Sequence, residues 1–372
     1  MKSSETDMHY MNMALALAEK GRGFTSPNPM VGAVIVKNSQ VAGRGWHKAA
    51  GGPHAEINAI ADAGNEAAGA TMYVTMEPCN HHGHTPPCTK AVIEAGISRV
   101  VSAMADPNPR VTGGGNDFLR AHGIDVTCGV CQNEAEKLNI FFIKHVRTGL
   151  PYVILKCAAT LDGKTATTTG DSKWITGPAA RRRVHEMRHA VDGIMVGVDT
   201  IKADDPALTT RLENFTGKNP VRIILDTKLT IPEHAKVIQK QWAFDTIIAT
   251  GADTSVEKRI NLERRGARIL DVPVKEGRVD VTALMEKLGK MNITSILVEG
   301  GSRVAASMLR AGEVDRICYF YAPKILAGDG IPMCSGSAPE TMASATGVKN
   351  IEIKRFENDI MIEGDVIKTP EK

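Results

Sequence analysis

The stretch GGPHAEINAIADAG (51–64) places His54 and Glu56 two residues apart, directly before an apolar run with helical spacing. In the middle of a helix, side chains at positions i and i+2 do not face each other. They can share one target only where the chain enters the helix and the target lies off its end. The Gly-Gly-Pro sequence marks such an entry. The stretch therefore predicts a helix over 54–63 with both side chains at its start, although a capped surface histidine has the same pattern.

A second stretch, TMEPCNHHGHTPPCTKAVIEAG (75–96), supplies two thiols, Cys79 and Cys88, with eight residues between them. A Pro-Pro pair introduces a helix over 87–95 that stops at a glycine. Cys88 thus falls in the first turn of a helix, where positive partial charge favours thiolate over thiol. With the imidazole of His54, the two thiolates make a three-ligand zinc site with an open fourth position.

An open zinc site lowers the pKa of its bound water to about 7 and so produces hydroxide at neutral pH. Glu56 is then the proton shuttle and not a ligand. The order His-x-Glu followed by Pro-Cys resembles zinc-dependent nucleoside and nucleobase deaminases, although their signature has two residues between the cysteines. The alternative is a pair of structural cysteines beside a separate metal loop of His81, His82 and His84. It fits less well, because structural zinc sites usually have four closed ligands at other spacings.

Several segments along the chain resemble the bifunctional deaminase–reductase family of riboflavin biosynthesis. In the first half they are CNHHGHTPPC (79–88), SPNPMVGAVIV (26–36), GWHKAAGGPHAE (45–56) and DPNPRVTGGG (106–115). In the second half they are LKCAATLDGKTA (155–166), SKWITG (172–177), DDPALTTR (204–211) and LVEGG (297–301). The resemblance implies zinc-dependent removal of the 2-amino group from 2,5-diamino-6-ribosylamino-4(3H)-pyrimidinone 5′-phosphate. Hydride transfer from NADPH to C1′ then converts the ribosyl group into a ribityl chain.

The length, net charge and cysteine content of the chain indicate which partners and which cellular compartment fit it. A length of 372 residues suggests two domains. The net charge of +3 gives no case for a nucleic-acid partner, although a mildly basic chain suits a phosphorylated pyrimidine ribotide. Seven cysteines without a disulfide framework fit a reducing cytosol, so we expect a cytoplasmic enzyme. No apolar run reaches roughly 18 residues, which argues against a membrane span. We also expect a homo-oligomer, either a dimer or a tetramer.

Strands and helices alternate along the first part, which predicts an α/β sheet domain with helices on its faces. The expected helices are 7–20, 54–63, 87–95, 114–122 and a closing helix over 133–149, and the expected strands are 31–37, 71–75, 99–103 and 124–127. A Gly-Leu-Pro break then precedes a new strand, which places the domain boundary at 148. The resemblance makes 1–148 a zinc-dependent pyrimidine deaminase domain with the three-layer cytidine-deaminase-like fold.

The alternation resumes in the second part. The expected strands are 152–159, 192–198, 221–225, 245–249, 267–270, 294–299 and 315–322, followed by a hairpin over 350–367, and the expected helices are 178–190, 281–290 and 302–311. The resemblance implies that 149–372 is an NADPH-dependent reductase domain with a dihydrofolate-reductase-like fold.

In the first domain the resemblance assigns substrate contacts to Asn28, His47 and His82. Asn28 precedes a proline before strand 31–37, and its amide both donates and accepts, which suits the edge of a ring. An Asn-Pro turn explains the same pair, and the resemblance favours binding. The glycines at 113–115 lack the spacing of a dinucleotide loop, so we expect a turn before a helix there.

In the second domain, LVEGGSRVAASML (297–309) reads as a strand, a glycine pair and a helix. Bare glycines let N–H groups at a helix N-terminus approach a phosphate, although many strand–helix turns contain such a pair. The resemblance assigns NADPH binding to Ala158, Trp174, Thr200, Asp204, Thr227, Gly301, Ser302, Arg303 and Val304. It assigns substrate binding to Lys156, Ser172, Arg188, Leu208, Arg211 and Glu299.

Two of these residues have structural alternatives. Lys156 is partly buried if its strand is central and solvated if the strand lies at an edge. Arg188 borders the apolar stripe of helix 178–190. From there its planar guanidinium group can reach a cleft and bind the substrate 5′-phosphate through two hydrogen bonds. An ordinary salt bridge at the domain edge is the alternative.

Two other functions fit parts of the pattern. A single-function nucleobase or tRNA deaminase with an accessory nucleotide-binding domain would need a basic strip with stacking aromatics, but only 4% of the residues are aromatic. A nucleotide-binding or regulatory protein without catalysis would not need an intact set of His54, Glu56, Cys79 and Cys88. The sequence therefore favours the bifunctional enzyme, and it names no proton donor for the reduction.

Overall fold

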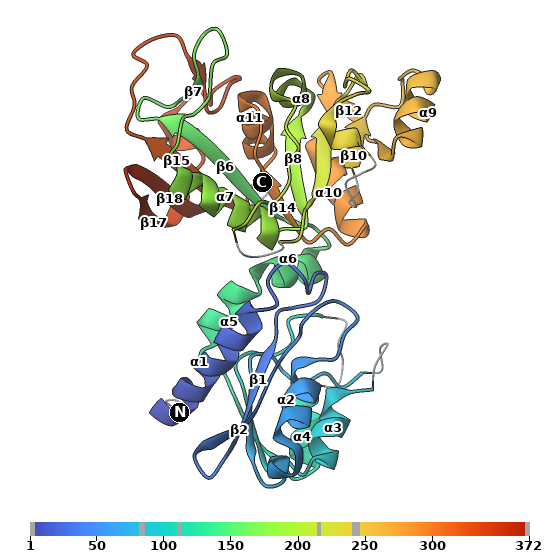
Figure 1. Ribbon diagram of the computed structural model, residues 1–372, viewed down its shortest axis with the longest axis vertical. Coiled ribbons are helices and arrows are strands. Elements are labelled where there is room, and N and C mark those ends of the chain that lie inside the picture. Colours follow the sequence, from blue (N-terminus) through green and yellow to red (C-terminus); the bar gives the residue numbers. More distant parts are fainter. Residues whose placement is uncertain (1–3, 82–85, 110–113, 214–216, 240–245, 369–372) are drawn as a thin grey trace. The chain divides into compact units, whose positions relative to one another are not determined.

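The computed structural model describes residues 4–81, 86–109, 114–213, 217–239 and 246–368. It divides into two compact units, Met1–Gly149 and Leu150–Lys372, each with its own sheet and core (Figure 1). The expected boundary at 148 lies one residue before the end of the first unit. Among the described residues, none of the helices is long and apolar enough to cross a membrane.

The first unit contains a five-stranded sheet in the order β2-β1-β3-β4-β5. Its strands are β1 (Gly32–Lys37), β2 (Gln40–Trp46), β3 (Thr71–Val74), β4 (Arg99–Ser102) and β5 (Asp125–Cys128). Strand β1 pairs antiparallel with β2 and β3, whereas β3, β4 and β5 run parallel. The sequence did not predict β2, because two glycines interrupt its alternation.

Helices cover both faces of this sheet and make three layers. They are α1 (Glu5–Glu19), α2 (Ala55–Ala63), α3 (Cys88–Glu94), α4 (Gly115–Ala121), α5 (Gln132–Leu138) and α6 (Ile140–Thr148), with a short 3-10 helix at Gly64–Ala67. One buried cluster joins α1, α5 and α6 to one face, and a second joins α2, α3 and α4 to the other (Figure 1). The expected three-layer α/β architecture is therefore confirmed.

Gly43 and Gly45 of β2 let helix α2 pack directly on this strand. A Cβ atom at Gly43 would lie 2.4 Å from the Ala59 carbonyl oxygen, and one at Gly45 would lie 2.2 Å from that of Ala55. Both distances are far below van der Waals contact, so a side chain at either position would push the helix away. The glycines that obscured β2 in the sequence are thus required by its packing.

The expected closing helix over 133–149 is instead two helices, α5 and α6, with a break at Asn139. The Asn139 side chain accepts a hydrogen bond from Met30 N at 2.8 Å and donates to Met30 O at 3.0 Å. Asn139 is buried, so these bonds satisfy backbone groups that water cannot reach. The break thereby fixes the segment that precedes β1.

The second unit contains a nine-stranded sheet in the order β11-β10-β9-β8-β14-β6-β15-β18-β17. Its strands are β6 (Tyr152–Thr160), β8 (Gly193–Gly197), β9 (Val221–Leu225), β10 (Thr246–Thr250), β11 (Ala267–Asp271), β14 (Ser295–Val298), β15 (Arg316–Ala322), β17 (Val348–Phe356) and β18 (Asp359–Val366). The strands from β11 to β15 are parallel, and β18 and β17 add an antiparallel edge. Two further pairs are β7 (Lys164–Ala166) with β16 (Ile331–Pro332), and β12 (Val274–Lys275) with β13 (Arg278–Val279).

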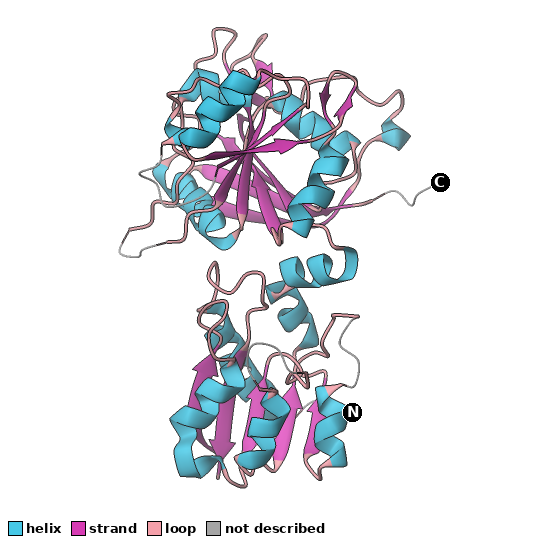
Figure 2. Ribbon diagram, turned by 90° about the vertical axis from the view of Figure 1, so that its right-hand side faces the viewer, coloured by secondary structure: helices cyan, strands magenta, loops and turns pink. Residues whose placement is uncertain are grey.

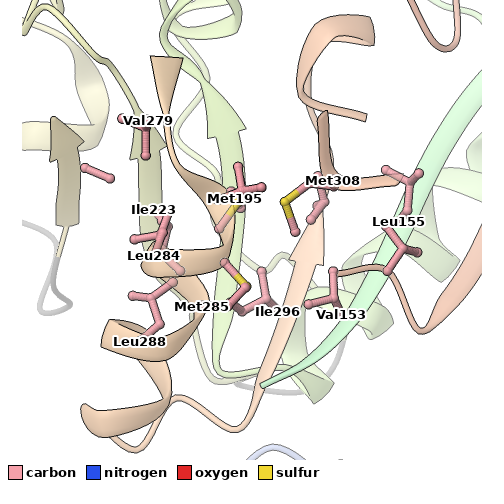
Figure 3. Packing of buried hydrophobic residues seen from close by; sticks show 14 of the residues in the cluster. Val153, Leu155, Met195, Ile223, Val279, Leu284, Met285, Leu288, Ile296 and Met308 are labelled. Carbon is pink, nitrogen blue, oxygen red and sulfur yellow. The ribbon is translucent and has the colours of Figure 1, made fainter. Parts of the chain in front are cut away.

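Helices also lie on both faces of this larger sheet (Figure 2). They are α7 (Pro178–Ala190), α8 (Val198–Asp204), α9 (Val256–Arg264), α10 (Val281–Lys290) and α11 (Ser302–Arg310), with 3-10 helices at Lys236–Ile238 and Met342–Ser344. The main core packs α10 and α11 on the sheet through Met195, Met285 and Met308 (Figure 3). Helices α8 and α9 escaped prediction because each buries a single residue, Ile201 and Leu262, and so has no apolar periodicity.

Strand β6 lies between β14 and β15 in the interior of the nine-stranded sheet. Lys156 on this strand is accordingly only 14% exposed. The edge-strand alternative for Lys156 is therefore wrong, and a partly buried lysine needs partners within the protein.

Candidate functional site

Three possible metal ligands meet at the N-termini of two helices in the first unit. His54 is the N-cap of α2, and Cys88 is the first residue of α3. The His54 Nδ1 atom lies 3.2 Å from Cys88 Sγ and 3.6 Å from Cys79 Sγ. All three ligand atoms lie within 4.8 Å of one another, which suits coordination of one ion. Imidazole nitrogen and cysteine sulfur are the donors that zinc prefers.

Hydrogen bonds within this cluster favour the thiolate form of Cys79. The pKa of Cys79 falls to about 4, chiefly because the Cys88 thiol donates to its sulfur, with His54 and the Cys88 backbone N–H also donating. The same contact raises the pKa of Cys88, since it is the donor, and burial adds to this effect. The hydrogen bond to Cys79 raises the pKa of His54. The cluster thus concentrates negative charge on sulfur beside a second thiol whose proton a cation would displace.

Glu56 lies in the first turn of α2 and is only 4% exposed. Burial raises the pKa of its carboxyl group, and negative charge on Cys79 raises it further. A carboxyl group whose pKa moves toward neutrality can both accept and return a proton at physiological pH. Glu56 also lines the same cavity as His54 and Cys79, so its carboxyl group is within the site and not in a separate core position.

That cavity has a volume of about 510 Å³, large enough for a nucleotide base and its sugar. Besides the cluster, its polar lining includes Asn28, His47, Glu77, His81, Asp106 and Asn108. Glu77 links this lining to helix α4, since its carboxylate accepts hydrogen bonds from Asp106 N at 3.0 Å and from Asn116 N of α4 at 2.8 Å. The predicted residue His82 lies outside the described residues.

Asn28 and His47 form a hydrogen-bonded pair in this lining. The Asn28 Nδ2 atom lies 3.2 Å from His47 Nε2, and His47 Nδ1 lies 3.1 Å from the Pro53 carbonyl oxygen. Burial lowers the pKa of His47, so the ring is neutral and carries its proton on Nδ1 toward Pro53. Its Nε2 atom then accepts from Asn28, which leaves the amide oxygen of Asn28 for a ligand. The chain does turn here, but the turn spans residues 25–28 and ends at Asn28, whose backbone N–H donates to Thr25 O.

In the second unit, Glu299 at the end of β14 lies between two cations. Arg188 holds its carboxylate with two hydrogen bonds of 2.6 and 3.0 Å, and Lys156 Nζ lies 3.5 Å away. Burial alone would raise the pKa of Glu299, but the charges of Arg188 and Lys156 outweigh it and lower the pKa to about 2. The salt bridge expected as an alternative for Arg188 is therefore formed, with a buried carboxylate and not at a domain edge.

Other predicted residues lie around the same arginine. Arg188 also donates to the Thr209 carbonyl oxygen at 3.1 Å, beside the buried Leu208. The Arg211 backbone N–H donates to Nδ1 of His185, which precedes Arg188 by three residues on α7. Burial and the charges of both arginines lower the pKa of His185 to about 4, so it is neutral at pH 7. Ser172 forms no hydrogen bond with this group among the residues that the structure describes.

A second cavity, of about 330 Å³, opens at the carboxyl ends of β8 and β9. The predicted cofactor residues Thr227, Arg303 and Val304 line it. The adjoining glycine pair passes close to its neighbours, because a Cβ at Gly300 would lie 2.8 Å from Val196 and 3.1 Å from Thr200. Gly300 therefore has no room for a side chain, whereas Gly301 is exposed at the N-cap of α11, a position where backbone N–H groups can approach a phosphate group.

The remaining predicted cofactor residues do not line this cavity. Trp174 is 64% exposed and stacks under Arg181 at 4.7 Å, and Asp204 pairs with Lys173. Ser302 exchanges a hydrogen bond with Ser335, and Ala158 lies within β6.

Comparisons with known proteins match both units. Residues 4–104 match the cytidine and deoxycytidylate deaminase zinc-binding region, and residues 151–362 match the RibD C-terminal domain. The riboflavin biosynthesis protein RibD of Bacillus amyloliquefaciens is 44% identical over 355 residues, or 95% of each chain. That of Escherichia coli (strain K12) is 42% identical over 367 residues, covering 96% of this chain and 98% of the relative. The chain belongs to the RibD family.

Solved RibD structures agree with this assignment over nearly the whole chain. Acinetobacter baumannii RibD superposes with a TM-score of 0.89 at 37% identity, covering 98% of this chain and 99% of that one. A diaminohydroxyphosphoribosylaminopyrimidine deaminase/5-amino-6-(5-phosphoribosylamino)uracil reductase from Thermotoga maritima gives 0.85 at 38% identity, covering 97% and 99%. The protein is thus a bifunctional enzyme of riboflavin biosynthesis, with a deaminase domain followed by a RibD reductase domain.

Sequence reasoning missed several residues that the RibD fold brings to these sites. Glu77, Asp106 and Asn108 line the deaminase cavity, and His185 contacts the Arg211 backbone in the reductase domain. The only signal for the first three was the quoted motifs around them, which carry the resemblance but gave these residues no individual role. His185 lacked a signal, because its partner lies 26 residues away in the chain.

The cysteine cluster generates a test of metal binding. We expect metal analysis of the purified protein to find about one zinc ion per chain, and Cys88→Ser to lose most of it because one of three ligands is removed. Cys128→Ser is the matched control, since Cys128 is an exposed free cysteine outside the cluster. Full zinc retention in Cys88→Ser would contradict the ligand set and favour structural cysteines.

Proposed function

We propose that the deaminase domain removes the 2-amino group of 2,5-diamino-6-ribosylamino-4(3H)-pyrimidinone 5′-phosphate, and that the reductase domain then uses NADPH to convert the ribosyl into a ribityl group. The observation that carries the proposal is the meeting of His54, Cys79 and Cys88 at two helix N-termini, with the buried Glu56 in the same cavity. The activities named for the Thermotoga maritima relative support this substrate.

The chain's own residues would hold the metal and move the proton. His54 Nδ1 and the sulfurs of Cys79 and Cys88 are the ligands, and their donor types fit zinc. When bound, zinc supplies hydroxide for attack on C2 at neutral pH. Glu56 accepts the proton released from water and returns it to the amino group, which leaves as ammonia while a C2–O bond replaces C2–N.

Substrate orientation falls to the polar lining of the deaminase cavity. The amide oxygen of Asn28, freed by the hydrogen bond that Asn28 donates to His47, can accept from an N–H group of the pyrimidine. His47 then acts mainly by holding Asn28. On the basis of the family resemblance, we also propose that His82 contacts the substrate.

In the reductase domain, bound NADPH supplies the hydride for C1′. We assign its site to Ala158, Trp174, Thr200, Asp204, Thr227, Gly301, Ser302, Arg303 and Val304. The exposed Gly301 at the N-cap of α11 supports a phosphate there. The substrate would lie against Lys156, Ser172, Arg188, Leu208, Arg211 and Glu299. Glu299 stays ionised beside its two cations and can accept hydrogen bonds from ring N–H or sugar hydroxyl groups.

We also infer a cytoplasmic homo-oligomer. All seven cysteines are free, which fits a reducing compartment. Strand β17 forms one edge of the nine-stranded sheet, with Ile351 and Ile353 exposed by 58% and 67%. Edge strands with exposed apolar side chains pair readily with another strand, and a second copy of β17 can supply one about a two-fold axis.

The proton shuttle is tested by Glu56→Gln, which keeps size and polarity but cannot carry the proton. We expect ammonia release from the diaminopyrimidine ribotide to fall by roughly 10²–10⁴-fold. Reduction of the pre-deaminated substrate with NADPH should stay near normal. Glu94→Gln, an exposed change on α3, is the control. Loss of both activities in a folded Glu56→Gln protein would argue against two separate sites.

The role of Arg188 is tested by Arg188→Ala in the reductase assay. If Arg188 binds the 5′-phosphate, the variant should show a raised KM for the ribotide, by about tenfold. The KM for NADPH and the deaminase rate should change little. Arg182→Ala on the same helix is the control, because Arg182 is 58% exposed. If the variant still prefers the phosphorylated over the dephosphorylated substrate as strongly as the parent does, Arg188 does not bind the phosphate and only contacts Glu299.

Assembly through β17 is tested by Ile353→Lys, which places a charge on the exposed edge strand. Analytical ultracentrifugation should show a homo-oligomer for the parent and a shift toward monomer for the variant, because a buried unpaired charge opposes pairing. Val256→Lys is the control on the exposed helix α9. A monomeric parent, or an unchanged variant, would exclude this interface.

A further inference from the structure

The cavity at the ends of β8 and β9 has more positive than negative side chains available to a ligand. Its lining includes the cations Lys228, Arg278 and Arg303 and the acids Asp199 and Asp226. Arg303 lies 3.9 Å from Asp199, so these two partly offset each other. Neither the Lys228 nor the Arg278 side chain makes an ion pair or hydrogen bond with another residue that the structure describes.

Asp226 lines the cavity but is almost fully buried, and its carboxylate is occupied by neighbouring groups of the protein. It is 1% exposed, and its carboxylate accepts hydrogen bonds from Ile231 N at 2.7 Å and from the Thr230 hydroxyl at 3.1 Å. In nucleotide-binding α/β folds, an acidic residue after a strand binds the ribose 2′-hydroxyl and favours NAD, whereas a nearby arginine accommodates the 2′-phosphate of NADP. The acid that could favour the unphosphorylated cofactor is therefore already used by the loop after β9.

The two unpaired cations and Thr227 line the same cavity. Lys228 follows Thr227 directly, and the β12–β13 hairpin brings Arg278 there because Val279 N donates to the Thr227 hydroxyl oxygen at 3.1 Å. Gly277 has a φ of 73° in the turn of this hairpin, a conformation that favours glycine. Because its oxygen accepts from Val279, the Thr227 hydroxyl can still donate its own proton to a ligand.

We propose that Lys228 and Arg278 bind the 2′-phosphate of the dinucleotide and make the reductase domain select NADPH over NADH. The inference rests on the proposed function, because it concerns the specificity of the same cofactor site. A phosphate monoester carries a charge of about −1.5 to −2 at neutral pH, which matches two otherwise unpaired cations. The arginine fork can bind it with two hydrogen bonds, and Lys228 adds a point charge.

Nucleotide binding to the full chain tests the proposal without turnover. NADPH and NADH are titrated in parallel by their fluorescence change on binding, with 2′,5′-ADP as a competitor. We expect Arg278→Ala and Lys228→Ala each to weaken NADPH binding by about tenfold and to leave NADH binding within about twofold. Lys275→Ala is the matched control, because Lys275 pairs with Arg278 across the hairpin but does not line the cavity. The melting temperature of each variant checks its fold, and Arg278→Lys should lose less affinity than Arg278→Ala.

The possible failures point to different conclusions. If the parent binds neither NADPH nor 2′,5′-ADP, the proposed reductase function itself fails. If Arg278→Ala and Lys228→Ala weaken NADPH and NADH equally, the cations contact a part common to both nucleotides, and the proposed selectivity is wrong while the cofactor site stands. If Lys275→Ala has the same effect as Arg278→Ala, only the general positive field of the hairpin matters, which also overturns the proposal.

Discussion

The close packing of helix α2 on strand β2 is the constraint on which the deaminase site depends. With no side chains at Gly43 and Gly45, the helix backbone comes within van der Waals contact of the strand. The Asn58 side chain strengthens this approach by donating to the Trp46 carbonyl oxygen at 2.9 Å. Because His54 and Glu56 begin this helix and His47 follows this strand, one packing contact sets the positions of all three side chains together.

The reductase site is built around a buried carboxylate, whereas the deaminase cluster is built around two cysteine sulfurs. Burying a carboxylate such as Glu299 is unfavourable unless cations and hydrogen bonds replace its water. Arg188 and Lys156 provide this replacement from two separate elements, α7 and β6. The geometry of α7, β6 and β14 at this end of the sheet is thus coupled through one carboxylate, so a change at any of the three would disturb the other two.

How much could be predicted from the sequence depended on the distance between interacting residues. Local signals, such as a glycine-proline entry before His54, pointed to the cluster of His54, Cys79 and Cys88 and to most helices and strands. The burial of Lys156 could not be predicted, because it follows from the order of strands and not from the strand itself. The pairing of Arg188 with Glu299 spans 111 residues, and nothing near Arg188 distinguishes a carboxylate partner from a phosphate. Strand β2 was missed for a different reason, since its glycines serve the neighbouring helix and weaken its own pattern.

The bond between Asn139 and Met30 bears on how the two catalytic modules could be separated. The matched zinc-binding region ends at residue 104, which would suggest a short self-sufficient deaminase. Yet the buried side-chain amide of Asn139 forms hydrogen bonds with the backbone N–H and carbonyl groups of Met30, which lies just before β1 in the same loop as Asn28. A separated deaminase domain would therefore need to extend beyond the segment that carries His54, Cys79 and Cys88. For gene fission or domain exchange within the family, the natural breakpoint lies after helix α6, where the compact unit ends at Gly149.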